Sequence, residues 1–212
     1  MTELTPKNLE LVDPTDQILN TTAAEVAPDE VLSLFIQGVI DRMLELSAGK
    51  GHSEHDSRQM VGLAAVQLGI GKRIITIDVT ADGSNKPQNL HVLINPEITE
   101  RSESLAIGRE ACWSCGNICG IVERSESVTL KAFDRTGTKI EHKLFGFVAR
   151  IAQHEIDHLD GIRFPDRIPN SEPERLHTVL PAEFPEYRLN WANWATICPR
   201  ERWEEMRDGN AQ

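Results

Sequence analysis

Residues 154–158, H-E-I-D-H, place two histidines four positions apart with a glutamate directly after the first. On an α-helix, residues four positions apart lie above one another on one face, so both imidazoles can bind the same metal ion. Glu155 can then reach a water molecule on that ion. Two imidazoles and a carboxylate are most of a hydrolytic metal site, and the third ligand decides which kind of site it is.

The residues around this pentapeptide favour a helix. Leu144, Phe147 and Ile151 lead into His154 at helical spacing, so one face is apolar and turns polar where the histidines begin. Gly161 is expected to end the helix. The alternative is a chance match, because a motif this short also occurs on polar helix ends without a metal.

Length and composition limit the class of protein to which this chain can belong. A chain of 212 residues suits one domain with a sizeable core, and its formal charge of −11 argues against a nucleic-acid binder. It has no apolar run of about 18 residues that could span a membrane. The first residues lack the basic start and apolar core of a secretory signal. Four cysteines are too few for a disulfide scaffold, which favours a cytoplasmic location with thiols free to bind metal.

Periodicity along the chain predicts the fold class. We expect an extended arm over residues 1–27, a helix from Pro28 to Gly49, strands over 73–79, 91–95, 97–108 and 127–134, and a return through 139–144 into the metal helix. The first helix carries an apolar stripe made of Leu32, Phe35, Ile36, Val39, Ile40 and Met43. This order predicts an α+β fold with a mostly antiparallel sheet packed around a central metal-binding helix.

Two units are expected along the chain: a catalytic domain over residues 1–168 and a C-terminal extension over residues 169–212. Trp191, Trp194 and Trp203 are too many large apolar groups for a solvated tail, so the extension should pack on the same domain. Residues 199–207 are expected to form a short closing helix.

Three further segments carry residues of interest. The polar loop 48–58 contains His52 and His55, but no strong third ligand accompanies them, which argues against a metal site there. Small residues gather at 62–65, where a helix start could pack tightly or a ligand could approach closely. Gln67 ends this apolar run, and a buried amide needs hydrogen-bond partners.

The third metal ligand could come from three places. A histidine six positions after His158 is ruled out, because Phe164 stands there and cannot bind a metal. A downstream glutamate, as in another kind of metallopeptidase, remains as a weaker alternative; the candidates are Glu172, Glu174 and Glu183. Cys112 lies upstream near the end of a predicted strand, and a thiolate with two imidazoles leaves an open catalytic position. Cys115 completes a C-x-x-C pair with Cys112, but no second pair accompanies it, so a separate zinc site is not expected.

Three stretches together resemble the peptide deformylase family. Its motifs G-φ-G-φ-A-A-x-Q, E-G-C-φ-S and H-E-φ-D-H, in which φ is apolar, correspond in order to residues 60–67 (M-V-G-L-A-A-V-Q), 110–114 (E-A-C-W-S) and 154–158. The resemblance covers about residues 10–168. Three motifs in the right order are far more specific than any one of them.

The resemblance implies a cytoplasmic, metal-dependent enzyme that removes the formyl group from the N-terminal methionine of new proteins. The cofactor would be one divalent ion, Fe²⁺ foremost, with Zn²⁺, Ni²⁺ or Co²⁺ also able to occupy the site. The residues that it assigns are the metal ligands Cys112, His154 and His158, the general acid/base Glu155, and the oxyanion holders Gln67 and the backbone N–H of Trp113.

Substrate and partners follow from the same resemblance. From their place beside the motifs, a pocket for the methionine side chain is expected at Val61, Gly62, Phe147 and Ile151. The partners would be N-formylmethionyl nascent polypeptides, which the enzyme could bind at the ribosome. We expect a monomer that binds neither nucleic acid directly nor a membrane.

Three departures from the family pattern bear on specificity. Met60 and Ala111 stand where the motifs have glycine, and Trp113 replaces a smaller apolar residue. Alanine at 111 would be strained if that backbone required a positive φ. Larger groups beside the metal leave open an altered acyl or peptide preference, or a deformylase fold that has lost turnover.

Overall fold

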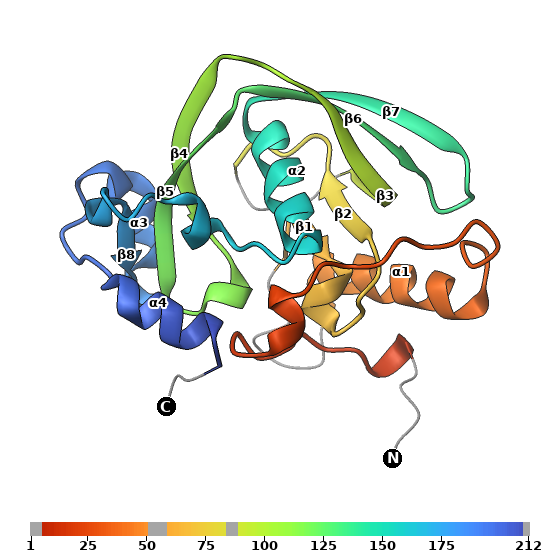
Figure 1. Cartoon of the computed structure of the whole chain (residues 1–212), viewed down its shortest axis with the longest axis horizontal. Helices are drawn as coiled ribbons and strands as arrows, with labels where there is room; N and C mark the ends of the chain where they lie inside the picture. The colour runs from red at the N-terminus through yellow and green to blue at the C-terminus, as the bar shows by residue number, and fades with distance from the viewer. Residues whose placement is uncertain (1–5, 51–58, 84–88, 210–212) are drawn as a thin grey trace.

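The computed structural model describes residues 6–50, 59–83 and 89–209, and Figure 1 shows the course of the chain. No helix in these ranges is both long and apolar enough to cross a membrane. The α-helices and strands in chain order are α1 (Leu34–Ser47), β1 (Gly62–Ala64), β2 (Ile74–Asp78), β3 (Leu90–Arg101), β4 (Leu105–Ala111), β5 (Ile118–Ser125), β6 (Ser127–Phe133), β7 (Lys139–Phe145), α2 (Gly146–Leu159), β8 (Leu176–Thr178), α3 (Phe184–Asn190) and α4 (Arg200–Arg207).

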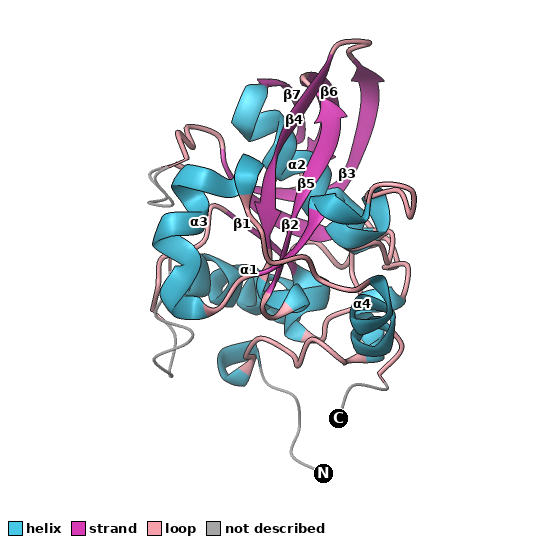
Figure 2. Ribbon diagram, turned by 90° about the vertical axis from the view of Figure 1, so that its left-hand side faces the viewer, coloured by secondary structure: helices cyan, strands magenta, loops and turns pink. Residues whose placement is uncertain are grey.

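The strands form two sheets around α2. A five-stranded sheet has the order β1-β2-β3-β6-β7, and a three-stranded sheet has the order β4-β5-β8. All pairings within these sheets are antiparallel. Figure 1 shows α2 enclosed by the strands, and Figure 2 shows α1 and α4 towards the end opposite the strand tips. The predicted α+β fold with a central helix is confirmed.

The buried face of α2 explains why the helix lies at the centre. Its apolar residues Ala149, Ile151, Ala152, Ile156 and Leu159 share one buried cluster with residues of the five-stranded sheet. Burial of each of the larger side chains stabilises the folded protein by about 1.5–3 kcal/mol. Because this face is fixed against the sheet, the polar face that carries the histidines is held towards the other sheet.

The first helix begins later than predicted. Residues 28–33 form turns, and α1 starts after Ser33, whose side-chain oxygen accepts a hydrogen bond from the Ile36 backbone N–H at 3.2 Å. That cap competes with the earlier start suggested by Pro28. Leu32 is consequently 69% exposed and Phe35 43% exposed, so neither belongs to the buried stripe. The other four predicted residues of the stripe, Ile36, Val39, Ile40 and Met43, are buried as expected.

Strand β3 continues through Pro96, where a strand end was predicted. The register with β6 shifts between Ile94 and Glu97, so the proline lies in a bulge that needs no ladder hydrogen bond from it. Asn95 has a positive φ of 51° at this point. Its side chain bonds both the backbone N–H and the carbonyl of Val26 at 2.9 Å, which ties the N-terminal arm to the sheet.

Other boundaries also differ from prediction. The single strand expected over residues 97–108 is divided between β3, which ends at Arg101, and β4, which begins at Leu105. Leu144 belongs to β7 rather than to the metal helix, because the ladder with β6 runs on to Phe145. Strand β5 was not predicted. His52 and His55 lie outside the described residues.

The C-terminal segment is built into the fold. Strand β8 pairs with β5, which makes it an edge of the three-stranded sheet. Trp203 of α4 is fully buried, and its indole N–H donates to Asp166 at 2.8 Å. Trp191 and Trp194 are half-buried and pack beside the buried Tyr187. Three tryptophans of this segment therefore cover apolar surface, as their number suggested.

Candidate active site

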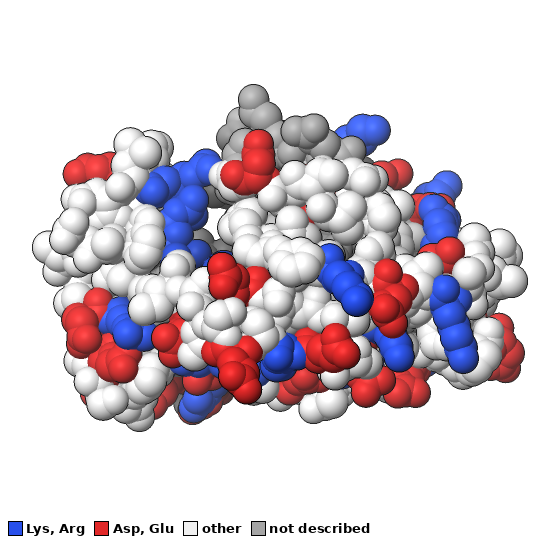
Figure 3. All heavy atoms as spheres, turned by 90° about the horizontal axis from the view of Figure 1, so that it is seen from above, with Lys and Arg blue, Asp and Glu red and all other residues white. Residues whose placement is uncertain are grey.

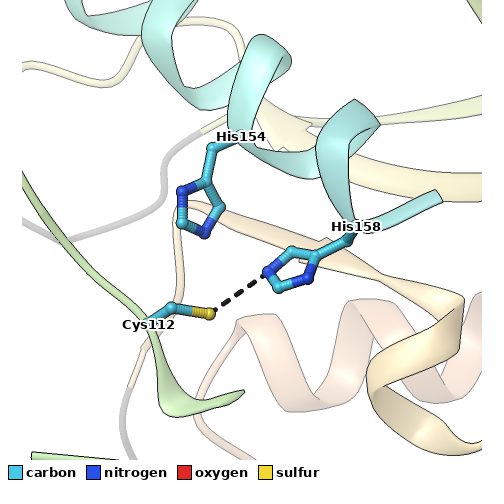
Figure 4. A group of neighbouring side chains, drawn as sticks. All are labelled: Cys112, His154 and His158. Atoms are coloured by element: carbon cyan, nitrogen blue, oxygen red, sulfur yellow. Dashed lines mark hydrogen bonds between the residues drawn. The ribbon is translucent and has the colours of Figure 1, made fainter. Parts of the chain in front are cut away.

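Three side chains able to bind a metal ion meet between α2 and the end of β4. One ligand atom from each of Cys112, His154 and His158 lies within 4.8 Å of the others, and no other cluster of this kind occurs within the described ranges. Figure 4 shows both imidazoles projecting from α2 towards the thiol, with His158 Nε2 at 3.2 Å from Cys112 Sγ. Tetrahedral zinc would hold such sulfur and nitrogen atoms about 3.5 Å apart, so the set fits one ion.

Local structure places each of the three. His154 and His158 are one helical turn apart on α2. Cys112 directly follows β4, whose last residue, Ala111, pairs with Cys119 of β5. The backbone N–H of Cys115 then bonds the carbonyl of Cys112 at 3.0 Å and turns the chain. The strand end thus presents the thiol to the polar face of the helix.

Glu110 orients the first histidine. Its buried carboxylate lies 2.8 Å from Nδ1 of His154 and accepts hydrogen bonds from Arg124 at 2.6 and 2.8 Å and from Arg150 at 2.8 Å. Because Nδ1 is engaged by the carboxylate, Nε2 of His154 is the nitrogen available to a metal. Such an outer partner fixes the ring and raises the basicity of the ligand.

A second buried carboxylate extends this network. Asp157 accepts from Arg124 at 2.7 Å and also bonds Arg167, so Arg124 links Glu110 to Asp157 across the site. The sequence motifs contain both acids, but sequence reasoning gave neither a role. The available signal was position, since Glu110 lies two residues before Cys112 and Asp157 directly before His158.

The surroundings of Cys112 favour the thiolate. A hydrogen bond from the Cys115 thiol and the nearby His158 hold the pKa of Cys112 well below its usual range, against the opposing effect of burial. Burial raises the pKa of Cys115 well above its usual range, so that thiol stays protonated and can donate. Since the thiolate is the form that binds metals, the donor set suits a divalent cation.

Glu155 points into the space beside the histidines. Its side chain is buried, and Oε2 has no hydrogen-bond partner among the described residues. Burial raises the pKa of Glu155 to about 7. A carboxyl group that titrates near neutrality can both accept and release a proton, which suits general acid–base work. Gly62 of β1 faces this carboxylate and lines the same cavity.

Gln67 is held in a fixed orientation. The segment at residues 62–68 is not a helix start but strand β1 followed by a 3₁₀-helix from Ala65 to Leu68. Oε1 of Gln67 accepts from the Ala64 backbone N–H at 2.9 Å, so its amide N–H₂ group is turned towards Ser114 Oγ at 3.0 Å and Cys112 Sγ at 3.4 Å. The amide donor is therefore preorganised beside Cys112, one of the candidate metal ligands.

A cavity of about 190 Å³ opens onto this group. All four residues predicted for the substrate pocket line it, together with Gln67, Trp113 and Glu155; the four are Val61, Gly62, Phe147 and Ile151. Arg109, Arg150 and Phe184 also line it, and sequence reasoning did not select them. Phe184 comes from α3, far along the chain, and no local pattern marks it as a cavity residue.

The three departures from the motifs are accommodated. Met60 and Trp113 form parts of the cavity wall, and the cavity remains open between the walls. Ala111 is extended and paired within β4, and Asn95 alone among the described non-glycine residues has a positive φ. The strain that a left-handed backbone would impose on Ala111 does not arise.

The downstream glutamates stand apart from the histidines. None of Glu172, Glu174 and Glu183 belongs to the ligand cluster. Glu172 forms an ion pair with Arg175, and Glu183 caps the Leu180 backbone N–H at 2.8 Å. A metallopeptidase centre that uses one of these carboxylates has no counterpart in the fold.

Known proteins resemble this chain over most of its length. The family model of polypeptide deformylases matches residues 8–174. A peptide deformylase of Symbiobacterium thermophilum is 40% identical over 166 residues, which cover 78% of this chain and 69% of that protein. One from Thermodesulfovibrio yellowstonii is 38% identical over 160 residues, covering 76% and 88%.

Solved structures agree with the sequence relatives. A crystal structure of a class I type b peptide deformylase from Acinetobacter baumannii with Met-Ala-Ser bound matches with a TM-score of 0.66 and 35% identity, covering 76% of this chain and 98% of that one. The actinonin-bound form of that enzyme matches with a TM-score of 0.64. On its sequence motifs, its fold and these similarities, the chain belongs to the peptide deformylase family.

Proposed function

We propose that this chain hydrolyses the formyl group from N-formylmethionine at the start of newly made polypeptides. The observation that carries the proposal is the meeting of Cys112, His154 and His158 beside Glu155 and Gln67 in one open cavity. A blocked binding protein would need Met60 and Trp113 to fill that space, and they form its walls instead.

The residues divide the reaction between them. Cys112, His154 and His158 would hold a divalent ion, which would act as a Lewis acid and lower the pKa of water. Glu155 takes the proton of the water that attacks the formyl carbon and delivers a proton to the departing amine, so the C–N bond breaks and formate leaves. The amide of Gln67 and the backbone N–H of Trp113 donate to the oxygen on which negative charge develops.

The methionine side chain enters the apolar part of the cavity. Val61, Phe147 and Ile151 line this part, and Gly62 leaves room beside them. Phe147→Ala should shift the preference among formylated first residues towards bulkier side chains. The ratio of kcat/KM for formyl-Met peptides to that for formyl-Phe peptides is compared between the wild type and Phe147→Ala. The same ratio in both proteins would show that Phe147 does not contact the first side chain.

The cellular setting completes the proposal. Fe²⁺ is proposed as the native ion, with Zn²⁺, Ni²⁺ and Co²⁺ as possible occupants, because a Cys-His-His set accepts several and availability selects among them. The four cysteines are free thiols, which fits the cytoplasm. We propose a monomer that meets its substrate at the ribosome, with catalysis in residues 1–168 and support from the extension 169–212.

Formate release from a formyl-Met-Ala-Ser peptide tests the function directly. The protein is prepared without oxygen and loaded with Fe²⁺ or Ni²⁺, and Glu155→Ala is loaded in parallel. Turnover that disappears in Glu155→Ala while its metal content is unchanged supports the proposal. No turnover at full metal occupancy contradicts it. Cys112→Ser should lose the metal; retention with peptidase activity would favour a different ligand set.

The second candidate function is deformylation with an altered preference for the first residue of the substrate, because Met60 and Trp113 add bulk to the cavity wall. Comparison of formyl-Met, formyl-Ala and formyl-Phe peptides in the wild type and in Met60→Gly measures it. A narrower range in the wild type, relaxed in Met60→Gly, would show that Met60 restricts the cleft. Identical ranges would exclude that role.

A further inference from the structure

Arg109 on β4 lies in the wall of the catalytic cavity without an anionic partner. Its side chain is half-buried and lines the cavity near Ala111 and Cys112. Among the described residues it makes no hydrogen bond and no ion pair, whereas Arg124 and Arg150 of the same region are both bound to Glu110. Burial and the charge of Arg188 lower the pKa of Arg109. The isolated protein thus keeps a costly positive charge at the cavity.

A second arginine stands next to it. Arg188 of α3 is close enough for its charge to act on Arg109, and its guanidinium donates to the Gly83 carbonyl at 2.6 Å. Two guanidinium groups that share one region repel each other, which favours an anion between or beside them. Figure 3 shows Lys and Arg side chains gathered along one border of a hollow in the molecule.

The C-terminal extension also supplies part of the cavity wall. Phe184 lines the cavity from α3, and both Phe184 and Arg188 lie beyond residues 8–174, the part matched by the family model. Helix α3 is anchored by the buried Tyr187, whose ring lies 5.6 Å from His177 and 5.3 Å from Trp194. Phe184 and Ala111 join this same cluster, so α3 is fixed directly beside the metal-ligand strand.

The acidic side chains near Arg109 already contact other groups. Glu110 is saturated by Arg124, Arg150 and His154. Glu155 faces the histidines and Gly62. In a chain with a formal charge of −11, Arg109 lies in the cavity wall without a carboxylate partner, and the charge of Arg188 acts on it. This arrangement points to an anion that arrives with the substrate.

We propose that Arg109 and Arg188 form an acidic-residue subsite, which binds the carboxylate of an aspartate or glutamate that follows formyl-methionine in the substrate. Phe184 packs against the adjoining apolar part of that chain. The inference rests on the proposed deformylase function and adds a sequence preference to it. The subsite depends on α3, so it is a property of the C-terminal extension of this chain.

Peptide pairs that differ only in charge test the subsite. Formyl-Met-Glu-Ala-amide and formyl-Met-Ala-Glu-amide are compared with their glutamine counterparts by kcat/KM for formate release. For a partly solvated carboxylate–guanidinium pair, one acidic peptide should be favoured about threefold to tenfold, mostly through KM. Arg109→Gln and Arg188→Gln should each reduce that preference. Arg188→Glu should favour a lysine-containing peptide instead.

The controls separate this inference from the function itself. Glutamine peptides report deformylation whether or not the subsite exists, so the ratio of kcat/KM for the Glu peptide to that for the Gln peptide, taken within each protein, measures the subsite independently of overall activity. Arg135→Gln, whose side chain pairs with Asp41 away from the cavity, should leave every preference unchanged. Amidated C-termini exclude recognition of a terminal carboxylate. Equal kcat/KM for Glu and Gln peptides in the wild type, or a preference that survives both arginine variants, would overturn the subsite.

Discussion

Gly62 leaves the space that the carboxylate of Glu155 occupies. A Cβ atom added to Gly62 would lie 2.4 Å from Oε1 of Glu155 and 2.8 Å from Cγ2 of Ile151. Both distances are far below ordinary van der Waals contact, so any side chain on β1 at this position must displace the acid. The glycine of the first motif is thereby linked to the glutamate of the third.

Gly62→Ala should therefore lower turnover while the metal site survives. We expect kcat to fall by at least about 100-fold, because a displacement of roughly 1 Å at a reacting group has that effect. Metal content should stay at the wild-type level, since Cys112, His154 and His158 are not touched. Gly71→Ala is the matched control, because its Cβ would meet nothing within 4 Å. Wild-type kcat in Gly62→Ala would show that Glu155 tolerates displacement.

Glu110→Gln should weaken metal binding. The variant removes the charge that orients His154, leaves Arg150 without its buried anion, and leaves Arg124 with Asp157 alone. Loss of such an outer partner typically lowers metal affinity about 10–100-fold, which competition with a chelator measures. Asp157→Asn removes the other end of the network without touching His154, so its metal affinity should change less. Equal losses in both variants would mean that overall stability, rather than the orientation of His154, sets the affinity.

Acid should destabilise the metal-free protein through the same network. Burial alone would raise the pKa of both carboxyl groups, but hydrogen bonds from Arg124 and His154 hold the pKa of Glu110 far below its ordinary value of 4.5, and hydrogen bonds from Arg167 and Arg124 hold that of Asp157 below 3.8. Their stabilising contribution is full above the unfolded-state values and is lost as pH falls towards the folded-state values. Urea unfolding at pH 6 and pH 3.5 should show this loss. Asp157→Asn should show a smaller loss, and an unchanged pH dependence would argue against the Asp157 contribution.

Gln67→Leu should slow the chemical step. It removes the amide donors beside Cys112 and Ser114 while keeping most of the side-chain volume. Loss of one oxyanion donor costs about 10²–10³ in kcat, whereas KM and metal content should change little. Single-turnover formate release isolates this step. A loss confined to KM would instead assign Gln67 to ground-state binding.

Several features could be predicted because they depend on neighbours in the chain. The alternation of Val128, Leu130 and Ala132 predicted β6, and all three are buried on one face. Helical spacing predicted that His154 and His158 share a face of α2. Boundaries were less predictable, because the Ser33 cap moved the start of α1 and the bulge at Asn95 carried β3 through Pro96. Both outcomes depend on hydrogen bonds that compete with equally plausible local choices.

The sequence by itself determined the motifs, the donor set on α2 and the chemistry those residue types allow, since spacing along one helix or strand fixes which side chains share a face. Only the tertiary structure decided that Gly62 makes room for Glu155, that Glu110 and Arg124 orient the site, and that Phe184 joins Arg109 at the cavity. These contacts join residues far apart in the chain. Their geometry follows from how two sheets and the C-terminal segment pack around α2, and no local periodicity encodes that packing.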